Sequence, residues 1–308
     1  MKTIKLNNGV EIPQIGFGTF LIPKDDINRT ISLAYDLGYC QFDTAWRYHN
    51  ESDIALAMKE HGINREDVFI TTKVNADALY RFGYRYGKHR ILNVRNFKSI
   101  RDVIQESFDN LHTDYIDLFL VHWPWPMYRD MYKELTKLYH EGRIRAIGVS
   151  SFTIGHLESL KEISDVKPAV NQIEMSPLNT QKELVDYCQK NGIAVEAMST
   201  FSHYRSIEPR LEILENPTIR PIADKYNKSI AQIVLRWLIQ KDVIIIPKTW
   251  DKNHLKENID ILDFQLTDQE MITIDNLDQG KCLNYNPYVP HVVKDIPKKF
   301  RHLTPIKC

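Results

Sequence analysis

Three apolar, strand-like runs of this 308-residue chain each end in an ionisable side chain. The first run ends at Asp43, the second at Lys73, and the third leads directly into His122. A carboxylate at the end of a buried strand requires a cation nearby, because an unpaired charge out of water is costly. If the strands lie parallel and adjacent, Lys73 faces the same side as Asp43 and answers its charge.

Tyr48 adds a phenol to this group, in the loop that follows Asp43. A nearby ammonium favours phenolate, so Lys73 is expected to lower the pKa of Tyr48 below its usual value of about 10. The four residues together predict a general acid that can transfer a proton near neutral pH. Each also has an ordinary structural interpretation: an interfacial tyrosine, a hydrogen-bonded core histidine, and a structural Asp and Lys ion pair.

Strand-like and helical segments alternate from residue 15 onward and form eight pairs. The expected strands are 15–20, 40–43, 68–73, 116–122, 146–150, 169–173, 194–197 and 243–247, and the expected helices are 26–37, 52–59, 97–111, 131–140, 154–163, 182–189, 231–240 and 253–262. Continuous apolar strands between helices indicate a parallel sheet. Eight uninterrupted pairs favour an α/β fold of the closed (β/α)8 TIM barrel type over a doubly wound sheet.

Residues 3–13 alternate around Asn7, Asn8 and Gly9, which predicts an N-terminal β-hairpin that serves as a cap and does not join the core. No repeat or Pro/Gly/Ser linker marks a second domain, so residues 1–308 are expected to form one barrel domain. Segments 74–96 and 200–220 and an extended C-terminal tail, 276–308, exceed what a barrel needs. The tail is expected to lie over the catalytic face.

Composition limits the partners. Lys and Arg total 40 and Asp and Glu total 40, so the net charge is zero and no long-range field attracts nucleic acid or an anionic membrane. The four cysteines, which have no zinc-ligand spacing, indicate free thiols in a reducing compartment. No apolar window suggests a signal peptide or membrane span, so the expected location is cytoplasmic. The expected partner is a small molecule, and the expected state a monomer or weak homo-oligomer.

Seven motifs occur in an order that resembles the aldo-keto reductase superfamily, from about Thr3 to Asp278. They are GFGTF, FDTAWRYHNE, TTK, LFLVHWP, RAIGVSSF, NQIEMSP and IPKTWDKNHLKEN. The resemblance implies a (β/α)8 barrel that binds NADP(H) at the carboxyl ends of its strands and reduces aldehydes or ketones, including sugars or keto acids. It places Tyr48 as proton donor, Lys73 as its activator, Asp43 as the support of Lys73, and His122 as the group that orients the carbonyl.

The same resemblance implies a cofactor site with three departures from the family pattern. Ser151 stands where an Asn is usual, Met198 where an aromatic ring is usual, and His254 where an Arg is usual. A His offers one strong donor to a phosphate where Arg offers a fork, so NAD(H) is an alternative to the expected NADP(H). The implied cofactor residues are Thr19, Asp43, Ser150, Ser151, Gln172, Met198, Ser199, Phe201, Lys248, Thr249, His254, Glu257 and Asn258.

The resemblance also implies a substrate pocket, lined by Phe20, Trp46, Arg47, Trp123 and Tyr285. Arg47 directly precedes Tyr48, where an apolar residue is common in the family. One hypothesis is that its guanidinium receives a carboxylate or polyhydroxylated substrate. The alternative is an Arg that points to solvent or pairs with Glu51.

Two other functions compete with carbonyl reduction. An NADP(H)-binding sensor or regulatory subunit would tolerate the three departures, but it would not need Tyr48 beside Lys73. A metal-dependent barrel hydrolase lacks ligands, since no HxH follows the first strand, and no metal is expected. Segment 74–96 is rich in Arg and Tyr. A mobile substrate lid is a better interpretation of it than nucleic acid binding in a chain without net charge.

Overall fold

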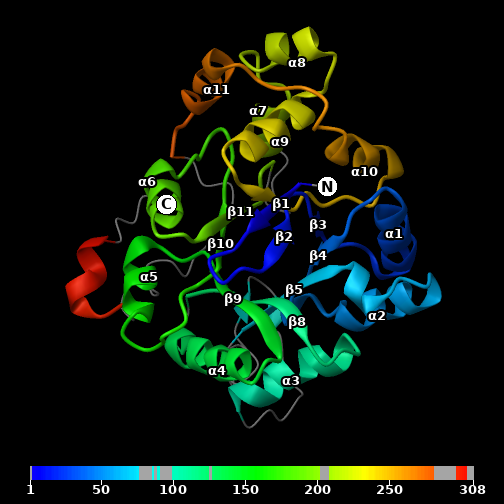
Figure 1. The fold of residues 1–308 in the computed structure, drawn as a ribbon. Helices are drawn as coiled ribbons and strands as arrows, with labels where there is room; N and C mark the ends of the chain where they lie inside the picture. Colours follow the sequence, from blue (N-terminus) through cyan, green and yellow to red (C-terminus); the bar gives the residue numbers. More distant parts are fainter. Residues whose placement is uncertain are drawn as a thin grey trace.

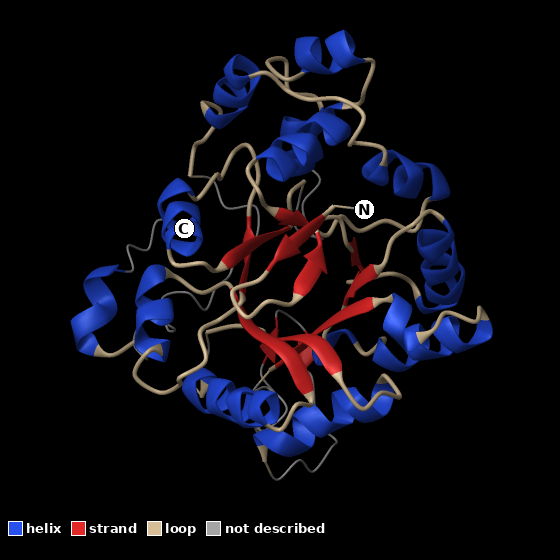
Figure 2. Cartoon of the chain, in the orientation of Figure 1, coloured by secondary structure: helices blue, strands red, loops and turns tan. Residues whose placement is uncertain are grey.

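The computed structural model describes residues 2–75, 85–86, 89–90, 99–124, 127–201, 208–280 and 296–303. Parallel strands occupy the centre, and helices surround them (Figure 1, Figure 2). Within the described residues, no helix is both long enough and apolar enough to cross a membrane.

Eight parallel strands form one sheet in the order β12-β11-β10-β9-β8-β5-β4-β3. They are β3 Phe17–Gly18, β4 Gln41–Asp43, β5 Phe69–Val74, β8 Ile116–Val121, β9 Ile144–Ser150, β10 Val170–Glu174, β11 Ala194–Met198 and β12 Ile244–Ile245. A parallel bridge between Ile15 and Ile245 joins the two ends of the sheet, where Gly16 N donates to Ile245 O at 2.7 Å. The predicted (β/α)8 barrel is therefore confirmed.

Helices follow the strands around the barrel, close to the expected ranges. They are α1 Lys24–Asp36, α2 Glu51–Glu60, α3 Ile100–Asn110, α4 Tyr128–His140, α5 Ile154–Leu160, α6 Lys182–Lys190, α9 Ile230–Gln240 and α10 Lys252–Ile259. Capping boxes begin α3 at Ser99 and α9 at Ser229, because each serine accepts from the third helical N–H while that residue's side chain returns the bond. Three helices were not predicted: α7 Glu208–Leu214, α8 Arg220–Tyr226 and α11 Asp268–Asp275.

The predicted hairpin is present as β1 Thr3–Lys5 and β2 Glu11–Pro13. Its turn uses Gly9 at a φ of 90°, which a residue with a Cβ rarely adopts. Leu6 and Ile12 pack against Leu118 of β8 and Val170 of β10 in a hydrophobic cluster inside the barrel. The hairpin thus covers the end of the barrel at which the strands begin. The expectation that it would not join the core was wrong, because Leu6 and Ile12 are buried in this cluster.

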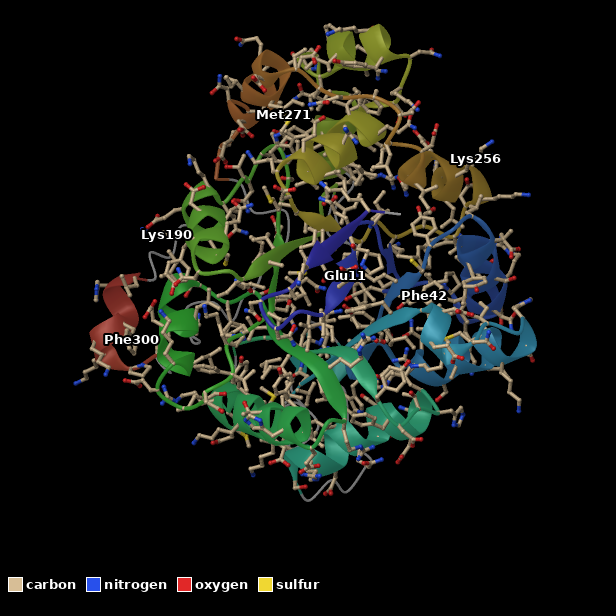
Figure 3. All side chains as sticks on the ribbon, in the orientation of Figure 1. Glu11, Phe42, Lys190, Lys256, Met271 and Phe300 are labelled. Atoms are coloured by element: carbon tan, nitrogen blue, oxygen red, sulfur yellow. The ribbon has the colours of Figure 1, made fainter. Side chains whose placement is uncertain are left out.

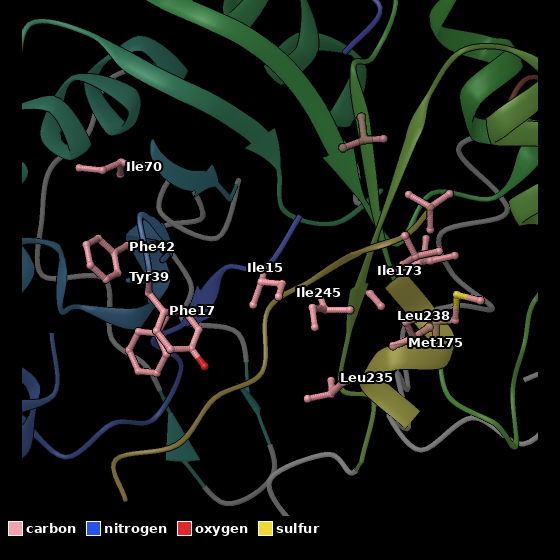
Figure 4. Packing of buried hydrophobic residues seen from close by; sticks show 14 of the residues in the cluster. Ile15, Phe17, Tyr39, Phe42, Ile70, Ile173, Met175, Leu235, Leu238 and Ile245 are labelled. Carbon is pink, nitrogen blue, oxygen red and sulfur yellow. The ribbon is translucent and has the colours of Figure 1, made fainter. Parts of the chain in front are cut away.

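Alternation along each strand separates two kinds of core. Phe17, Phe42 and Ile70 point outward and join the larger cluster between the sheet and the helices (Figure 4). Phe42 lies among the side chains inside the helical ring, while charged residues such as Lys256 lie on its outside (Figure 3). Inward positions are apolar near the hairpin and polar toward the opposite end of the barrel, where the candidate site is formed.

The C-terminal tail was expected to lie over the catalytic face. Its segment 281–295 lies outside the described residues, and so do residues 304–308. Among the described residues of the tail, Lys298–Leu303 form a 3-10 helix, η5, which packs beside α5 on the outside of the barrel (Figure 1). Most of segment 74–96, which was interpreted as a substrate lid, also lies outside the described residues. The lid therefore stays a prediction, and so does a single domain over residues 1–308.

Candidate functional site

The ends of β4 and β5 bring Asp43 and Lys73 together inside the barrel. Lys73 Nζ donates to the two carboxylate oxygens of Asp43 at 2.7 and 2.8 Å and to the backbone oxygen of Thr44 at 2.8 Å. Both side chains are buried. A buried ion pair of this kind is favourable only with such complete hydrogen bonding, which holds the ammonium in one position.

Tyr48 lies beside this pair. It ends the short 3-10 helix η1 Trp46–Tyr48, directly after β4. Lys73 Nζ is 5.0 Å from the centroid of the Tyr48 ring, and the His122 ring centroid is 5.7 Å from it. The structure therefore brings together all four residues that were expected to be catalytic.

The pKa of Tyr48 is raised, not lowered as expected from the sequence. Burial is the largest cause, and the charge of Lys73 opposes it. The prediction was wrong because it counted the ammonium and omitted the water that the phenol loses. The raised pKa keeps the phenol protonated at neutral pH, which is the form that a proton donor needs.

Lys73 and His122 have opposite charge states. Burial alone would lower the pKa of Lys73, but the charges of Asp43 and Tyr48 raise it, so the ammonium persists. Burial, with smaller effects from the charges of Lys73 and Arg47, lowers the pKa of His122 well below its usual 6.5. A neutral imidazole can donate one hydrogen bond to a carbonyl oxygen without adding a second positive charge beside Lys73.

A polar cradle lies next to the four residues, on β9 and β10. Ser150 Oγ is buried and has no hydrogen-bond partner among the described residues. A buried hydroxyl without a partner costs free energy, so it indicates a ligand that supplies one. Gln172 lies on the neighbouring strand, paired in register with Ser150. These two groups fit the carboxamide of a nicotinamide ring.

The other residues expected at this end of the cofactor adjoin the cradle. Ser151 has a φ of 62° and donates its N–H to Gln172 O at 2.8 Å. Thr19 Oγ1 donates to Asp43 O at 2.9 Å. Met198 ends β11, Ser199 follows it with a φ of 55°, and Phe201 packs against the core.

A second polar region lies after β12. The Lys248 ammonium is 4.7 Å from the centroid of the Trp250 ring. Loss of surrounding water lowers the pKa of Lys248, and so does the charge of Arg210 in α7. The positive charges of these two side chains favour an anion in this region. Arg210 was not recognised in the sequence, because no strand or motif marked its segment.

The remaining cofactor residues lie in α10 and in the segment directly before it. Asp251 accepts hydrogen bonds from the N–H groups of Asn253 and His254 at 2.8 and 3.0 Å, and Thr249 Oγ1 accepts from Asp251 N at 3.1 Å. His254 is exposed, whereas Asn258 is buried and Glu257 is half-buried. An acidic cap therefore lies close to the expected phosphate position, beside His254.

The expected pocket residues are divided. The Phe20 ring is 4.7 Å from the Tyr48 ring, and the Trp123 ring stacks on His122 at 5.5 Å. Trp46 instead packs into the outer core, and its Nε1 donates to Glu106 of α3 at 2.6 Å. These contacts do not support Trp46 as a pocket wall. Tyr285 lies outside the described residues.

Glu196 is a further polar residue that the sequence reasoning missed. It lies in the middle of β11, fully buried, and accepts from the amides of Gln41 and Gln172. A signal was present, because an ionisable residue inside the apolar run AVEAM must have an unusual environment. No group of three His, Cys, Asp or Glu residues that could hold a metal occurs in the described part of the chain.

Comparison with known proteins gives consistent matches. Residues 14–279 match the model of the Aldo/keto reductase family. Glyoxal reductase of Bacillus subtilis (strain 168) is 39% identical over 288 residues, which cover 92% of this chain and 96% of that protein. Methylglyoxal reductase DkgA of Escherichia coli (strain K12) is 35% identical over 287 residues, which cover 92% and 96%. A crystal structure of a Bombyx mori aldo-keto reductase in complex with NADP is 32% identical, with a TM-score of 0.79 over 96% of this chain and 97% of that one.

Proposed function

The chain belongs to the aldo/keto reductase family, and we propose that it reduces an aldehyde or ketone group of a small molecule to an alcohol, with NADPH as hydride donor and Tyr48 as proton donor. One observation carries the assignment of roles. A buried ammonium, fixed by both oxygens of Asp43, stands 5.0 Å from the Tyr48 ring centroid. A site that only bound a cofactor would have no use for this arrangement.

The protein's own groups manage the proton and the developing charge. When bound, the reduced nicotinamide supplies hydride to the carbonyl carbon. The neutral His122 donates a hydrogen bond that orients the carbonyl oxygen, and Tyr48 gives that oxygen its proton. Lys73 lowers the cost of the phenolate that remains, and Asp43 keeps Lys73 in position.

The direct test follows the loss of NADPH absorbance on addition of small aldehydes, ketones and keto acids. Glyoxal and methylglyoxal belong in the panel because two relatives are named as reductases of these compounds. Turnover that requires the phenol of Tyr48 supports the proposal. Tight NADPH binding without turnover of any carbonyl would instead support a cofactor-binding sensor or regulatory subunit.

Arg47 gives the proposed substrate site a preference for anions. It lies in η1 between Trp46 and Tyr48, and its positive charge contributes to the lowered pKa of His122. The charge of the guanidinium thus acts on the group that orients the carbonyl, and a guanidinium can bind a carboxylate with two hydrogen bonds. Small aldehydes or ketones that carry a carboxylate are the preferred class.

Arg47→Ala is expected to raise the KM for glyoxylate by about 10-fold to 100-fold, because a hydrogen bond to a charged group contributes roughly 1.5 to 3 kcal/mol. The KM for the uncharged methylglyoxal should change less than threefold. Arg47→Lys keeps the charge and loses the two-pronged hydrogen bonding of the guanidinium. Its KM for glyoxylate should lie between those of the wild type and of Arg47→Ala. Steady-state kinetics on both substrates decides the matter, and equal losses on both would contradict this role.

NADPH is the preferred cofactor in this proposal because Lys248, after β12, and Arg210, in α7, both contribute positive charge to one region. The 2′-phosphate of NADPH carries negative charge that NADH lacks. Two nearby residues weaken this preference. His254 offers a single donor in place of the two that an Arg guanidinium offers, and the Asp251 carboxylate repels a phosphate. The discrimination should therefore depend on the two cations.

Lys248→Met and Arg210→Met are each expected to raise the KM for NADPH about tenfold, as the loss of one charged hydrogen bond implies. The KM for NADH should stay within about twofold. Lys256→Met is the matched control, because this lysine is exposed on α10 at the outside of the molecule (Figure 3). Equal changes in the KM for NADPH and the KM for NADH would show that Lys248 and Arg210 do not recognise the 2′-phosphate.

A further inference from the structure

Glu196 is a buried ionisable group, close to Asp43, that the proposed reaction does not use. Its strand neighbours Ala194 and Met198 point into the barrel with it, and in the β10-β11 ladder it pairs with Gln172. It is 0% exposed. Within the described residues it forms no ion pair, so its charge lacks the direct cation that buried carboxylates normally need.

Two amides take the place of that cation. Gln41 Nε2 donates to Glu196 Oε1 at 2.8 Å, and Gln172 Nε2 donates to Glu196 Oε2 at 2.5 Å. Room for Gln41 comes from Gly16, where an added Cβ would lie 2.6 Å from Gln41 Cδ. Burial, followed by the charge of Asp43, raises the pKa of Glu196 to about 7. Burial of this carboxyl group costs free energy, which indicates that the group serves a function in the site.

The contacts of Glu196 fix the orientation of the Gln172 side-chain amide. Its amide nitrogen also donates to Asp43 Oδ2 at 2.9 Å, so its two N–H groups face two separate carboxyl groups. Rotation of the amide by half a turn would place the carbonyl oxygen against both carboxyls and lose both bonds. The two carboxyls therefore fix which end of the amide faces inward, and Oε1 remains for a ligand.

We propose that Glu196 is a positioning residue for the cofactor. It holds the Gln172 side chain so that Gln172 Oε1 can accept a hydrogen bond from the N–H group of the nicotinamide carboxamide. The inference rests on the proposed function, since it needs a nicotinamide beside Ser150 and Gln172. Asp43 alone would hold one N–H of Gln172, but it already binds Lys73 through both oxygens. Glu196 supplies the bond that is not shared with the proton-transfer groups.

The test compares binding of whole NADPH with binding of 2′,5′-ADP, which has the adenosine half and no nicotinamide. Glu196→Met keeps the volume and removes both acceptors, so the Kd for NADPH should rise about tenfold, as the loss of one oriented hydrogen bond implies. The Kd for 2′,5′-ADP should stay within about twofold. Glu196→Gln keeps one acceptor for Gln172 and should restore NADPH binding to near the wild-type value.

A second pair of variants separates positioning from damage to the fold. Glu196→Asp withdraws the carboxyl by one methylene and should give the same selective loss in a polar, foldable core. In a Gln172→Ala background, Glu196→Met should add no further loss, because its effect passes through Gln172. The inference would be overturned if the Kd for NADPH stayed unchanged in Glu196→Met and Glu196→Asp. It would also be overturned if the Kd for 2′,5′-ADP rose as much as the Kd for NADPH. Failure of the wild type to bind NADPH or to reduce carbonyls would overturn the proposed function instead.

Discussion

Tyr48→Phe is expected to lower kcat for carbonyl reduction about 10²-fold to 10⁴-fold, the range that a positioned general acid contributes. The hydroxyl is the only group that the change removes, and the ring keeps its contacts with Phe20 and His122. The Kd for NADPH should change by less than about threefold, because the hydroxyl acts on the substrate oxygen. Single-turnover kinetics at saturating NADPH measures the loss directly.

Tyr115→Phe is the matched control for this experiment. Its hydroxyl contacts Arg65 O at 3.4 Å, next to the beginning of β8 and far along the barrel from Lys73. It should retain full activity. Undiminished turnover by Tyr48→Phe would show that another group, with His122 the first candidate, delivers the proton.

Lys73→Met is expected to have two effects of similar weight. Removal of the ammonium leaves Asp43 buried and uncompensated, which should reduce the free energy of unfolding by about 3 to 5 kcal/mol. The phenolate of Tyr48 also loses its stabilising charge, so kcat should fall at least as far as in Tyr48→Phe. Urea unfolding and single-turnover kinetics measure the two effects separately.

The double variant Asp43→Asn with Lys73→Met distinguishes these effects. It removes both charges, so most of the lost stability should return, whereas activity should not. Gln172 would keep an acceptor in the amide oxygen of the new Asn. Recovery of activity together with stability would mean that Lys73 acts through the fold alone, and the proposed role of its charge would be wrong.

Most of the fold could be predicted because it follows from local patterns. Each strand that was found by its apolar run is present, and the ionisable residues at the ends of β4, β5 and β8 meet as expected. Helices α7 and α8 were missed because they lie in a segment interpreted as a loop after β11. Their short polar sequences show little of the periodicity that marks a helix.

The parts of the site that could not be predicted depend on the whole fold. Burial of Tyr48 by several elements raises its pKa, and no single neighbour in the sequence announces this. Trp46 adjoins the catalytic tyrosine in sequence, yet it turns to Glu106 on α3, sixty residues away. Contacts such as that of Gln172 with Glu196 arise only when β10 and β11 are placed in register.

The seam that closes the barrel, between residues 14–18 and residues 245–247, has a consequence for folding. Among the described residues, three backbone hydrogen bonds near Ile245 and Pro247 close the ring there, at 2.7, 3.0 and 3.2 Å, and they connect residues more than two hundred positions apart. Closing so long a loop costs chain entropy that short-range contacts do not recover. The seam should therefore be the last part to form during folding and the first to open to hydrogen exchange.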